Sequence, residues 1–208
     1  RRLRTDHIEI MLFHSPMANE YRTVIEQFYP TMDKMRDQGK FRLIGISTSY
    51  QNEPRQTAAE YALKTDPELW DVIMLKYGIL NQFAAREALP LAMEHNIGII
   101  NMAVIREKLP NPELLESQIK LWKQNGTISL VSVPDENPLG WLLHDDVDTI
   151  VDAGYKFAAD HPAIHTVLTG TASLEHLKSN VKALESPVLD EHDKKRLSKI
   201  FKEVSEYI

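Results

Sequence analysis

The 208-residue chain is long enough for one sizeable domain, because 43% of its residues are hydrophobic and can fill a core. Its formal net charge of −6 comes from acidic and basic residues mixed along the chain, so we expect neither a nucleic-acid nor an anionic-membrane partner. The chain contains no cysteine, which excludes disulfides, thiolate nucleophiles and cysteine-ligated metals.

The first part of the chain alternates between predicted strands and predicted helices. Residues 8–13 are mostly apolar and β-friendly, as expected for a strand that is covered on both faces. A helix is predicted over residues 30–38, because a proline fits its first position and a glycine follows its last. A second strand over residues 41–46 and a second helix over residues 57–64 continue the alternation.

The same alternation continues to the end of the chain. Strands are predicted over residues 71–77, 97–103 and 164–168. Residues 127–143 fit neither pattern clearly. The remaining helices are predicted over residues 84–95, 112–124, 147–160, 174–184 and 190–207.

The spacing of these elements predicts a parallel α/β fold. Successive strands start near residues 8, 41, 71 and 97, so they are separated by roughly thirty residues, the size of one βα unit. Five strands are too few for a closed eight-stranded barrel, which leaves either a barrel segment or an open doubly wound sheet. The sequence lacks a G-x-G-x-x-G motif and a G-x-x-x-x-G-K-[ST] loop, which disfavours open-sheet nucleotide folds. No linker divides the chain, so we predict one domain over residues 1–208.

Polar residues follow several strands, at the end where parallel α/β barrels build their active sites. His14 could orient or protonate a substrate oxygen, or it could be a structural hydrogen-bonding residue. Ser47 and Thr48 could bind a ligand amide, or they could cap the next helix or close a turn. Gly170 and Thr171 precede a helix and form either an anion site or an ordinary turn.

Other classes of site are disfavoured by spacing and length. No H-E-x-x-H or comparable pattern occurs, so we predict no metal site. The longest apolar run, over residues 97–105, is far shorter than the roughly 20 residues of a membrane-spanning helix. No signal peptide follows Arg1, and the lack of cysteine suits a reducing compartment, so we expect a cytoplasmic protein without a membrane partner.

Taken in order, the strand motifs resemble those of the aldo/keto reductase family over nearly the whole chain. The sequence RLRTDHIE of residues 2–9 with LFHSP of residues 12–16 is similar to the family's RLGTDYIDL…LHxP entry into its fourth barrel strand. The sequence GKFRLIGIS of residues 39–47 is similar to GKxRxIGVS at the fifth. The sixth, seventh and eighth strands are matched by residues 70–74, 95–100 and 166–171, the last followed by Glu175, His176, Leu177 and Asn180.

The resemblance implies a partial (β/α)8 TIM barrel that corresponds to strands 4–8 and their helices. It implies an oxidoreductase that reduces aldehydes or ketones by hydride transfer from NAD(P)H, acting on a small-molecule carbonyl or sugar-like substrate. In the family a tyrosine acid is assisted by a lysine and an aspartate, while a histidine orients the carbonyl. Of these only the histidine maps onto this sequence, at His14. We therefore expect residues 1–208 to be a single domain that lacks the first three βα units and is inactive alone.

The resemblance also assigns cofactor-binding positions. Ser47 matches the family serine near the nicotinamide amide, whereas Thr48 replaces an asparagine and Met74 a frequent glutamine. Ala103 opens a segment where related members often read S-P-L-G-x-G, and Arg106 within it could contribute charge. With these we group Gly170, Thr171, His176 and Asn180.

The same positions bear on the choice of dinucleotide. Asn180 matches the family asparagine near the adenosine phosphate, but His176 stands where many NADP-preferring members carry arginine. NADP is the expected cofactor, with NAD as the alternative and a weakened grip on the 2′-phosphate. A different alternative is a non-enzymatic binding or regulatory protein on the same scaffold, which the altered segment after Ala103 favours. The sequence predicts no oligomeric state.

Overall fold

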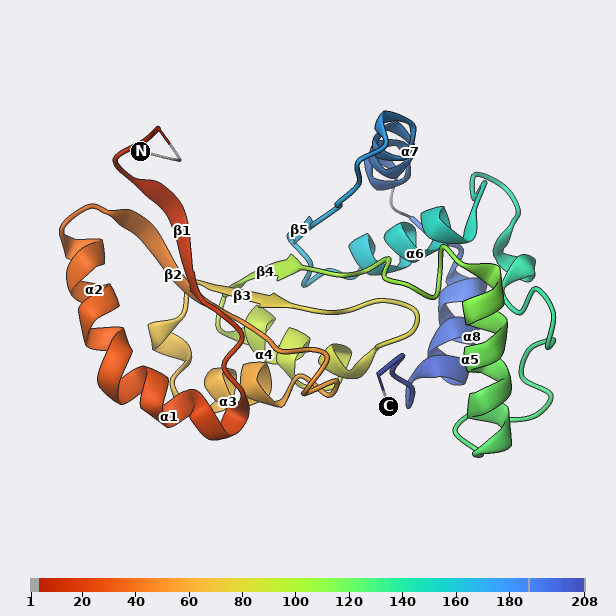
Figure 1. The fold of residues 1–208 in the computed structure, drawn as a ribbon, viewed down its shortest axis with the longest axis horizontal. Helices are drawn as coiled ribbons and strands as arrows, with labels where there is room; N and C mark the ends of the chain where they lie inside the picture. The colour runs from red at the N-terminus through yellow and green to blue at the C-terminus, as the bar shows by residue number, and fades with distance from the viewer. Residues whose placement is uncertain (1–3, 187, 208) are drawn as a thin grey trace.

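Five short apolar segments form one parallel sheet in the computed structural model, which describes residues 4–186 and 188–207. The strands are β1 (Ile8–Phe13), β2 (Phe41–Ser47), β3 (Val72–Leu75), β4 (Gly98–Asn101) and β5 (Thr166–Val167). Each strand pairs in parallel with the next one along the chain, so β1 and β5 are the edges of the sheet (Figure 1). The parallel α/β prediction is confirmed.

The order of the strands decides between the two sheet types that the sequence left open. A doubly wound sheet reverses its strand order at a switch point, whereas here the order runs β1-β2-β3-β4-β5 without reversal. Such winding in one direction is typical of barrels. The strand register is also regular, with Phe13 beside Ile46 and Ile73 beside Ile99. The carboxyl ends of the strands therefore meet at one edge of the sheet.

The helices begin where the sequence places capping residues. The N-cap side chains of the four longest helices after β4 accept hydrogen bonds from backbone N–H groups in the first turn, which satisfies donors that a helix otherwise leaves free. These caps are Asn111, Thr149, Ser173 and Asp190. The helices are α1 (Tyr21–Thr23), α2 (Tyr29–Asp37), α3 (Thr57–Thr65), α4 (Ala88–Glu94), α5 (Pro112–Gln124), α6 (Ile150–Ala159), α7 (Leu174–Glu185) and α8 (Glu191–Phe201).

Several predicted bounds need correction. The helix predicted over residues 84–95 starts only at Ala88, because Phe83–Ala85 forms a 3-10 turn, and α6 starts three residues later than predicted, after its Thr149 cap. The helix predicted over residues 190–207 ends at Phe201. Beyond it the chain turns back, with Ser205 bridged to Asn81 and the Glu206 N–H bound to the Leu80 carbonyl at 3.2 Å. These tertiary contacts outweigh the helical pattern of the tail.

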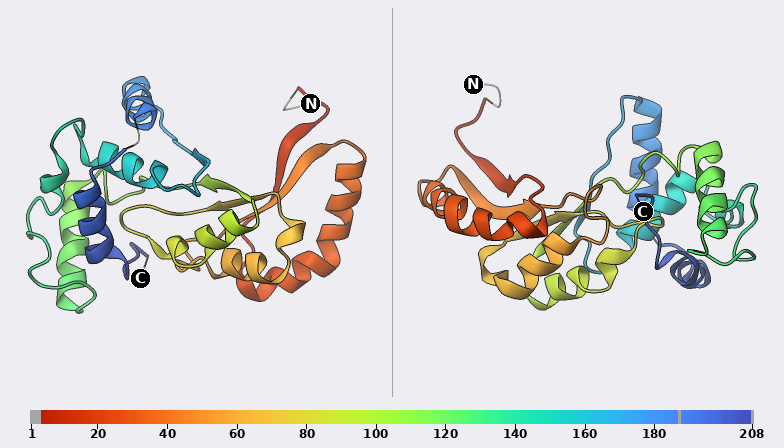
Figure 2. Two further views of the ribbon diagram at one scale, coloured as in Figure 1. Left: turned by 180° about the vertical axis from the view of Figure 1, so that it is seen from behind. Right: turned by 60° about the horizontal axis from the view of Figure 1, so that its bottom comes forward.

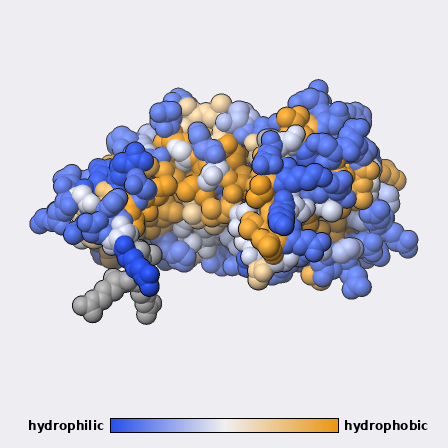
Figure 3. All heavy atoms as spheres, turned by 90° about the horizontal axis from the view of Figure 1, so that it is seen from above, coloured by the Kyte–Doolittle hydropathy of each residue, from blue (hydrophilic) through white to orange (hydrophobic). Residues whose placement is uncertain are grey.

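The two faces of the sheet differ. Helices α3 and α4 lie on one side of it in every view (Figures 1 and 2), and that face carries the fully buried Ile44, Ile46 and Ile73. On the opposite face Ile10, Leu12 and Met74 are only half-buried and stand outside the core cluster of buried side chains. Leu168, just past β5, is 46% exposed. Apolar residues gather in the middle of the face seen in Figure 3.

The expectation that β1 is covered on both faces is therefore wrong for the part of the chain that the structure describes. Not one residue of β1 is fully buried there. The physical reason is that the described elements beside β1 pack on a single face, where Phe13 contacts Tyr29 of α2 and Trp70 just before β3. Within the described residues no helix is long and apolar enough to cross a membrane.

Candidate functional site

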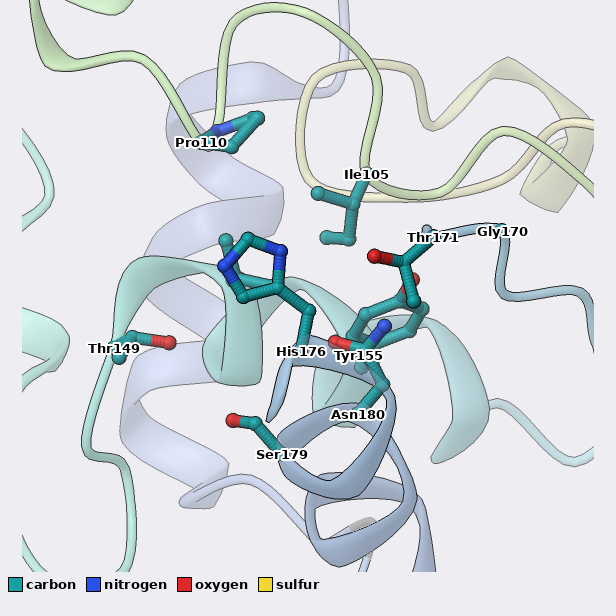
Figure 4. Close-up of a pocket in the computed structure, with 10 residues that line it drawn as sticks. Ile105, Pro110, Thr149, Tyr155, Gly170, Thr171, His176, Ser179 and Asn180 are labelled. Carbon is teal, nitrogen blue, oxygen red and sulfur yellow. The ribbon is translucent and has the colours of Figure 1, made fainter. Parts of the chain in front are cut away.

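A cleft opens at the carboxyl ends of β4 and β5. It consists of two adjoining cavities of about 400 Å³ and about 480 Å³, which share Ile105, Tyr155 and Gly170 in their walls. Figure 4 shows the first cavity, into which side chains from α6 and α7 and from the two strand-following loops converge. The cleft is large and contains both apolar walls and polar groups, as ligand sites do.

The first cavity lies against the start of α7. After β5 the chain turns at Gly170 and Thr171 and enters α7 through its cap Ser173, whose Oγ accepts the His176 N–H at 3.3 Å. Gly170 has no atom within 4 Å of where a side chain would begin, so its backbone faces open space. Thr171 and His176 are exposed and line the cavity. A helix N-terminus with accessible backbone and hydroxyl groups favours an anion.

A small hydrogen-bond network fixes the floor of this cavity. The Asn180 Nδ2 and the Tyr155 hydroxyl both donate to Thr169 Oγ1, at 2.6 and 2.9 Å. Asn180 is buried, yet it still contributes to the cavity wall. Burial raises the pKa of Tyr155 above its ordinary value, so its hydroxyl stays protonated. The network joins α6, α7 and the end of β5.

The second cavity is walled by the segment that follows β4. Ala103 has a left-handed backbone with φ of 54°, and the Lys76 ammonium donates a hydrogen bond to its carbonyl. Ile105 approaches α6 at Gly154, where a Cβ would lie 2.4 Å from Ile105 Cδ1. Arg106 is exposed at the rim and places a permanent positive charge beside the cleft.

A second group of predicted residues lies at the ends of β1 to β3 and does not line either cavity. His14 is exposed just after β1. Ser47 is buried, and its Oγ accepts the Ser15 N–H at 2.9 Å and donates to the Phe13 carbonyl at 3.3 Å. Ser47 and Met74 are neighbours in the β2–β3 register. The Ser47 hydroxyl thus ties β1 to β2.

Thr48 points into the helix layer. Its hydroxyl is buried and donates to Gln56 Oε1 at 2.7 Å, just before α3 begins, while its N–H binds the Met74 carbonyl at 2.9 Å. This contact agrees with the reading of Thr48 as a residue that closes the turn before the next helix. A ligand would have to displace Gln56 to use that hydroxyl.

The structure therefore brings together six of the ten predicted positions in the cleft: Ala103, Arg106, Gly170, Thr171, His176 and Asn180. Sequence reasoning missed Tyr50, which lines the second cavity from the loop after β2, and Tyr155 of α6. It also missed Lys76 behind the Ala103 carbonyl. No motif spacing in the sequence identifies these three residues, because each reaches the cleft through contacts with residues distant in sequence. Among the described residues no group of three or more histidines and carboxylates could hold a metal ion.

The cleft also fits the nicotinamide dinucleotide that the strand motifs imply. An open backbone at Gly170, the N-terminus of α7 and the Arg106 guanidinium are suited to phosphate groups. The wall formed by Ile105 and Tyr155 offers an apolar surface between them. Buried Asn180 supplies a polar group at one end.

Comparison with known proteins gives a consistent picture. The family model for the aldo/keto reductase family matches residues 1–202. An uncharacterized oxidoreductase of Bacillus subtilis is 24% identical over 197 residues, which are 94% of this chain. A D-threo-aldose 1-dehydrogenase of a Pseudomonas species is 28% identical over 195 residues, or 89% of this chain. The chain spans 61% and 55% of the lengths of these two relatives.

Two solved structures show the same fold. An aldo-keto reductase of Bacillus halodurans in its holo form has a TM-score of 0.66 and 22% identity, covering 99% of this chain and 66% of that one. An aldo-keto reductase of Klebsiella pneumoniae in complex with NADPH has a TM-score of 0.61 and 18% identity, covering 100% of this chain and 63% of that one.

Proposed function

The chain belongs to the aldo/keto reductase family, and we propose that its cleft binds a nicotinamide dinucleotide used to reduce an aldehyde or ketone. The observation that carries the proposal is that six positions matching the family's cofactor site line one cleft. These positions come from two loops and a helix, and the first and last of them, Ala103 and Asn180, are 77 residues apart in the sequence. The NADPH named in the complex of the Klebsiella protein supports the class of ligand.

Each part of the cleft has a role in this proposal. His176, Thr171 and Asn180 hold the adenosine phosphate end, beside the N-terminus of α7. Gly170 and Arg106 contact the pyrophosphate, because one exposes its backbone and the other carries positive charge. Ala103 shapes the same wall. The nicotinamide end lies toward Met74 and Ser47, at the ends of β2 and β3.

The bound dinucleotide supplies the hydride, and the chain's own residues bind and orient. His14 stands exposed at the end of β1, next to the hydroxyl-linked ends of β1 and β2. We assign it to hydrogen-bond the substrate carbonyl oxygen, which is where negative charge develops in the transition state. Ser47 holds the backbone of this corner in place, and Thr48 supports it through Gln56. The substrate class is a small carbonyl compound of sugar-like polarity, in line with the name of the Pseudomonas relative.

We further propose that β1 to β5 correspond to strands 4–8 of a (β/α)8 barrel. The sequential parallel order, the two open sheet edges and the uncovered apolar face around Leu12 and Met74 support this arrangement. The 66% coverage of the Bacillus halodurans structure agrees with it. In that barrel the tyrosine, lysine and aspartate of the family stand on strands 1–3. The 208 residues alone then bind the dinucleotide without reducing carbonyls.

The choice of dinucleotide follows from the groups around His176. A neutral imidazole cannot reproduce the two-pronged hydrogen bonding of arginine to a phosphate. Ser179, also in this wall, donates to the buried Asp152 carboxylate at 3.3 Å, which places negative charge close to the cavity. We propose NADP as the cofactor with a weak hold on its 2′-phosphate, so that NAD competes with it.

A fluorescence titration of the chain with NADPH and with NADH tests the proposal. We expect saturable binding of both, and a loss of about tenfold in affinity for Asn180→Ala, the equivalent of one hydrogen bond of about 1.4 kcal/mol. Asn125→Ala, an asparagine in the exposed turn after α5, is the matched control and should bind as the wild type does. Absence of dinucleotide binding by the folded chain would refute the cofactor role.

A second function, a binding or regulatory protein on this scaffold, is favoured by the glycine-poor segment after Ala103. The enzyme and binding-protein hypotheses are distinguished by joining the first three βα units of the Bacillus halodurans enzyme to the N-terminus of the chain. Carbonyl reduction by that fusion, lost in its His14→Ala variant, supports the enzyme. Dinucleotide binding without turnover supports the binding protein, and turnover by the 208 residues alone contradicts the proposed division of the barrel.

A further inference from the structure

Three buried lysines among the described residues, Lys76, Lys123 and Lys156, have the same kind of hydrogen-bond partners. Each ammonium donates to a backbone carbonyl of a distant loop and pairs with a carboxylate. Lys123 holds the Val133 carbonyl at 2.6 Å together with Asp135, and Lys156 holds the Ser186 carbonyl together with Asp146 at 2.7 Å. Lys76 donates to the Ala103 carbonyl and pairs with the Glu206 carboxylate. Of these three lysines, only Lys76 donates to a carbonyl of a residue that lines the second cavity.

Lys76 is almost completely enclosed just past the end of β3. It is 1% exposed, and its Nζ lies 2.7 Å from the Glu206 carboxylate, whose side chain is 4% exposed. The ammonium also lies 5.6 Å from the ring centre of Tyr50 and 6.0 Å from that of Tyr207. Burial lowers the pKa of Lys76, and the charge of Glu206 opposes that effect.

The carbonyl that Lys76 holds belongs to a strained residue. Ala103 adopts a φ of 54°, a left-handed conformation that a residue with a Cβ takes only at an energetic cost. A hydrogen bond from a buried charged donor stabilises this conformation, because its alternative leaves the ammonium without that acceptor. Ala103 and Arg106 form the cavity wall that follows.

The carboxylate that Lys76 holds belongs to the C-terminal tail. Residues 204–207 pass over the end of β3, where Ser205 accepts a hydrogen bond from Asn81 Nδ2 at 3.2 Å. Tyr207 packs on Tyr50 with ring centres 5.5 Å apart, and Tyr50 lines the same cavity as Ala103. Two parts of the cavity wall, Ala103 and Tyr50, therefore meet the same ammonium, and that ammonium and Tyr50 both contact the tail.

We propose that Lys76 is a positioning residue that clamps the C-terminal tail to the Ala103–Arg106 wall, so that dinucleotide affinity depends on a tail that touches no cofactor position. The inference rests on the proposed function of the cleft. Lys76 acts by holding the Ala103 carbonyl and, with Glu206, the Tyr207 and Tyr50 pair. Lys123 and Lys156 hold backbone carbonyls in the same way, but those carbonyls belong to Val133 and Ser186, which do not line the cleft.

The variants must avoid leaving a buried charge unpaired, because that alone can unfold a protein. The double variant Lys76→Met/Glu206→Gln meets this condition, because it removes both charges with little change of volume. Glu206→Gln alone keeps the hydrogen bond to Ala103 but leaves the Lys76 ammonium without its carboxylate, so its affinity is referred to the folded fraction. The control is Lys123→Met, which removes an ammonium with the same kind of partners, while its carboxylate partner Asp135 is 60% exposed and stays solvated.

Hydrogen exchange of the chain without dinucleotide tests the clamp itself. We expect the amides of residues 102–107 and of residues 203–207 to exchange at least tenfold faster in the double variant than in the wild type, with β1 and α3 unchanged. In Lys123→Met the acceleration should be confined to residues 125–136. Unchanged exchange at residues 102–107 in the double variant, with the chain folded, overturns the clamp.

Titration with NADPH then tests its consequence. The double variant should bind NADPH about tenfold or more weakly, Glu206→Gln several-fold more weakly, and Lys123→Met within twofold of the wild type. Wild-type affinity in the double variant overturns the inference but leaves the proposed function intact. A wild-type chain that binds no NADPH refutes the proposed function, and the exchange experiment still decides whether Lys76 holds the wall.

Discussion

The ends of β1 to β3 and the ends of β4 and β5 both carry polar residues, but these residues have different surroundings. At the first three strands the hydroxyls of Ser47 and Thr48 are buried and already bonded to protein partners. At the last two strands Thr171, His176 and Asn180 line open space. We call the first region the hydroxyl corner and the second the cleft. Their difference teaches that side chains at positions of one family's cofactor motif can be either hydrogen-bonded within the protein or open to a cavity.

The comparison predicts that substitutions in the hydroxyl corner change stability, whereas those in the cleft change affinity. The largest expected effect is on stability at Gly45 of β2. A Cβ there would lie 2.2 Å from the Val72 carbonyl oxygen and 2.6 Å from Leu12 Cδ2. We expect Gly45→Ala to lower the free energy of unfolding by about 3 kcal/mol in urea titration, because backbone cannot yield as a side chain can. A loss below about 1 kcal/mol would show that the sheet relaxes there.

A second effect of intermediate size is expected at Thr48. Thr48→Val keeps the shape but removes the donor to Gln56 Oε1, and the Gln56 Nε2 already has no partner among the described residues. Leaving a buried amide oxygen unpaired should cost about 2 kcal/mol of unfolding free energy. Chemical denaturation measures this loss. Thr48→Ser, which retains the hydroxyl, should recover most of it, and equal losses in both variants would mean that the hydroxyl is not what matters.

In the cleft, the choice of dinucleotide should respond to position 176. His176→Arg places a fixed positive charge at the exposed start of α7, and we expect the affinity ratio of NADPH to NADH to rise about tenfold. The matched control is His192→Arg, an exposed histidine in the first turn of α8. An unchanged ratio in His176→Arg would place the 2′-phosphate elsewhere.

The smallest expected effect concerns the helices behind the cleft. His144 is bound to Asp145 at 2.9 Å and to the buried Asp193 of α8 at 2.7 Å, and these hydrogen bonds raise its pKa above 6.5. A raised pKa in the folded state means that the protonated form stabilises the fold. This stabilisation is complete below the unfolded pKa of about 6.5 and is lost as the pH rises through the folded value.

The melting temperature should therefore fall as the pH rises from about 6.5 through the folded pKa, and His144→Gln should flatten that slope. Differential scanning calorimetry at a series of pH values measures it. A slope that is the same in His144→Gln would assign the pH dependence to other groups. Dinucleotide affinity should not follow this slope, since His144 lies outside the cleft.

The sequence predicted the local parts of this structure well. The bounds of β1 and α5 were predicted to the residue and those of β2, α2 and α3 to within one, because apolar periodicity and capping residues act over a few neighbouring positions. The family motifs likewise identified the strand ends. Contacts between distant segments carry no such signal. Lys76 meets Ala103 and Glu206, and Tyr155 meets Thr169, only after the sheet has formed.

The same reason explains which predicted site positions lie outside the two cavities. Motif matching placed Ser47 and Thr48 beside the cofactor, but it gives no information on whether a hydroxyl already has a protein partner. The Ser47 hydroxyl is already hydrogen-bonded to Ser15 and Phe13, and the Thr48 hydroxyl is hydrogen-bonded to Gln56. His176 and Asn180 lie at a cavity wall because the cap at Ser173 starts α7 there, and their role toward a cofactor stays a prediction.

The difference between the cleft and the hydroxyl corner is tested most directly by titrating NADPH into Asn180→Ala and Thr48→Val side by side, with each affinity referred to the folded fraction. Asn180→Ala should bind about tenfold more weakly than the wild type and lose about 1 kcal/mol of unfolding free energy or less. Thr48→Val should bind within twofold of the wild type despite its larger loss of stability. Weaker binding in Thr48→Val than in Asn180→Ala would contradict the assignment of the cleft as the dinucleotide site.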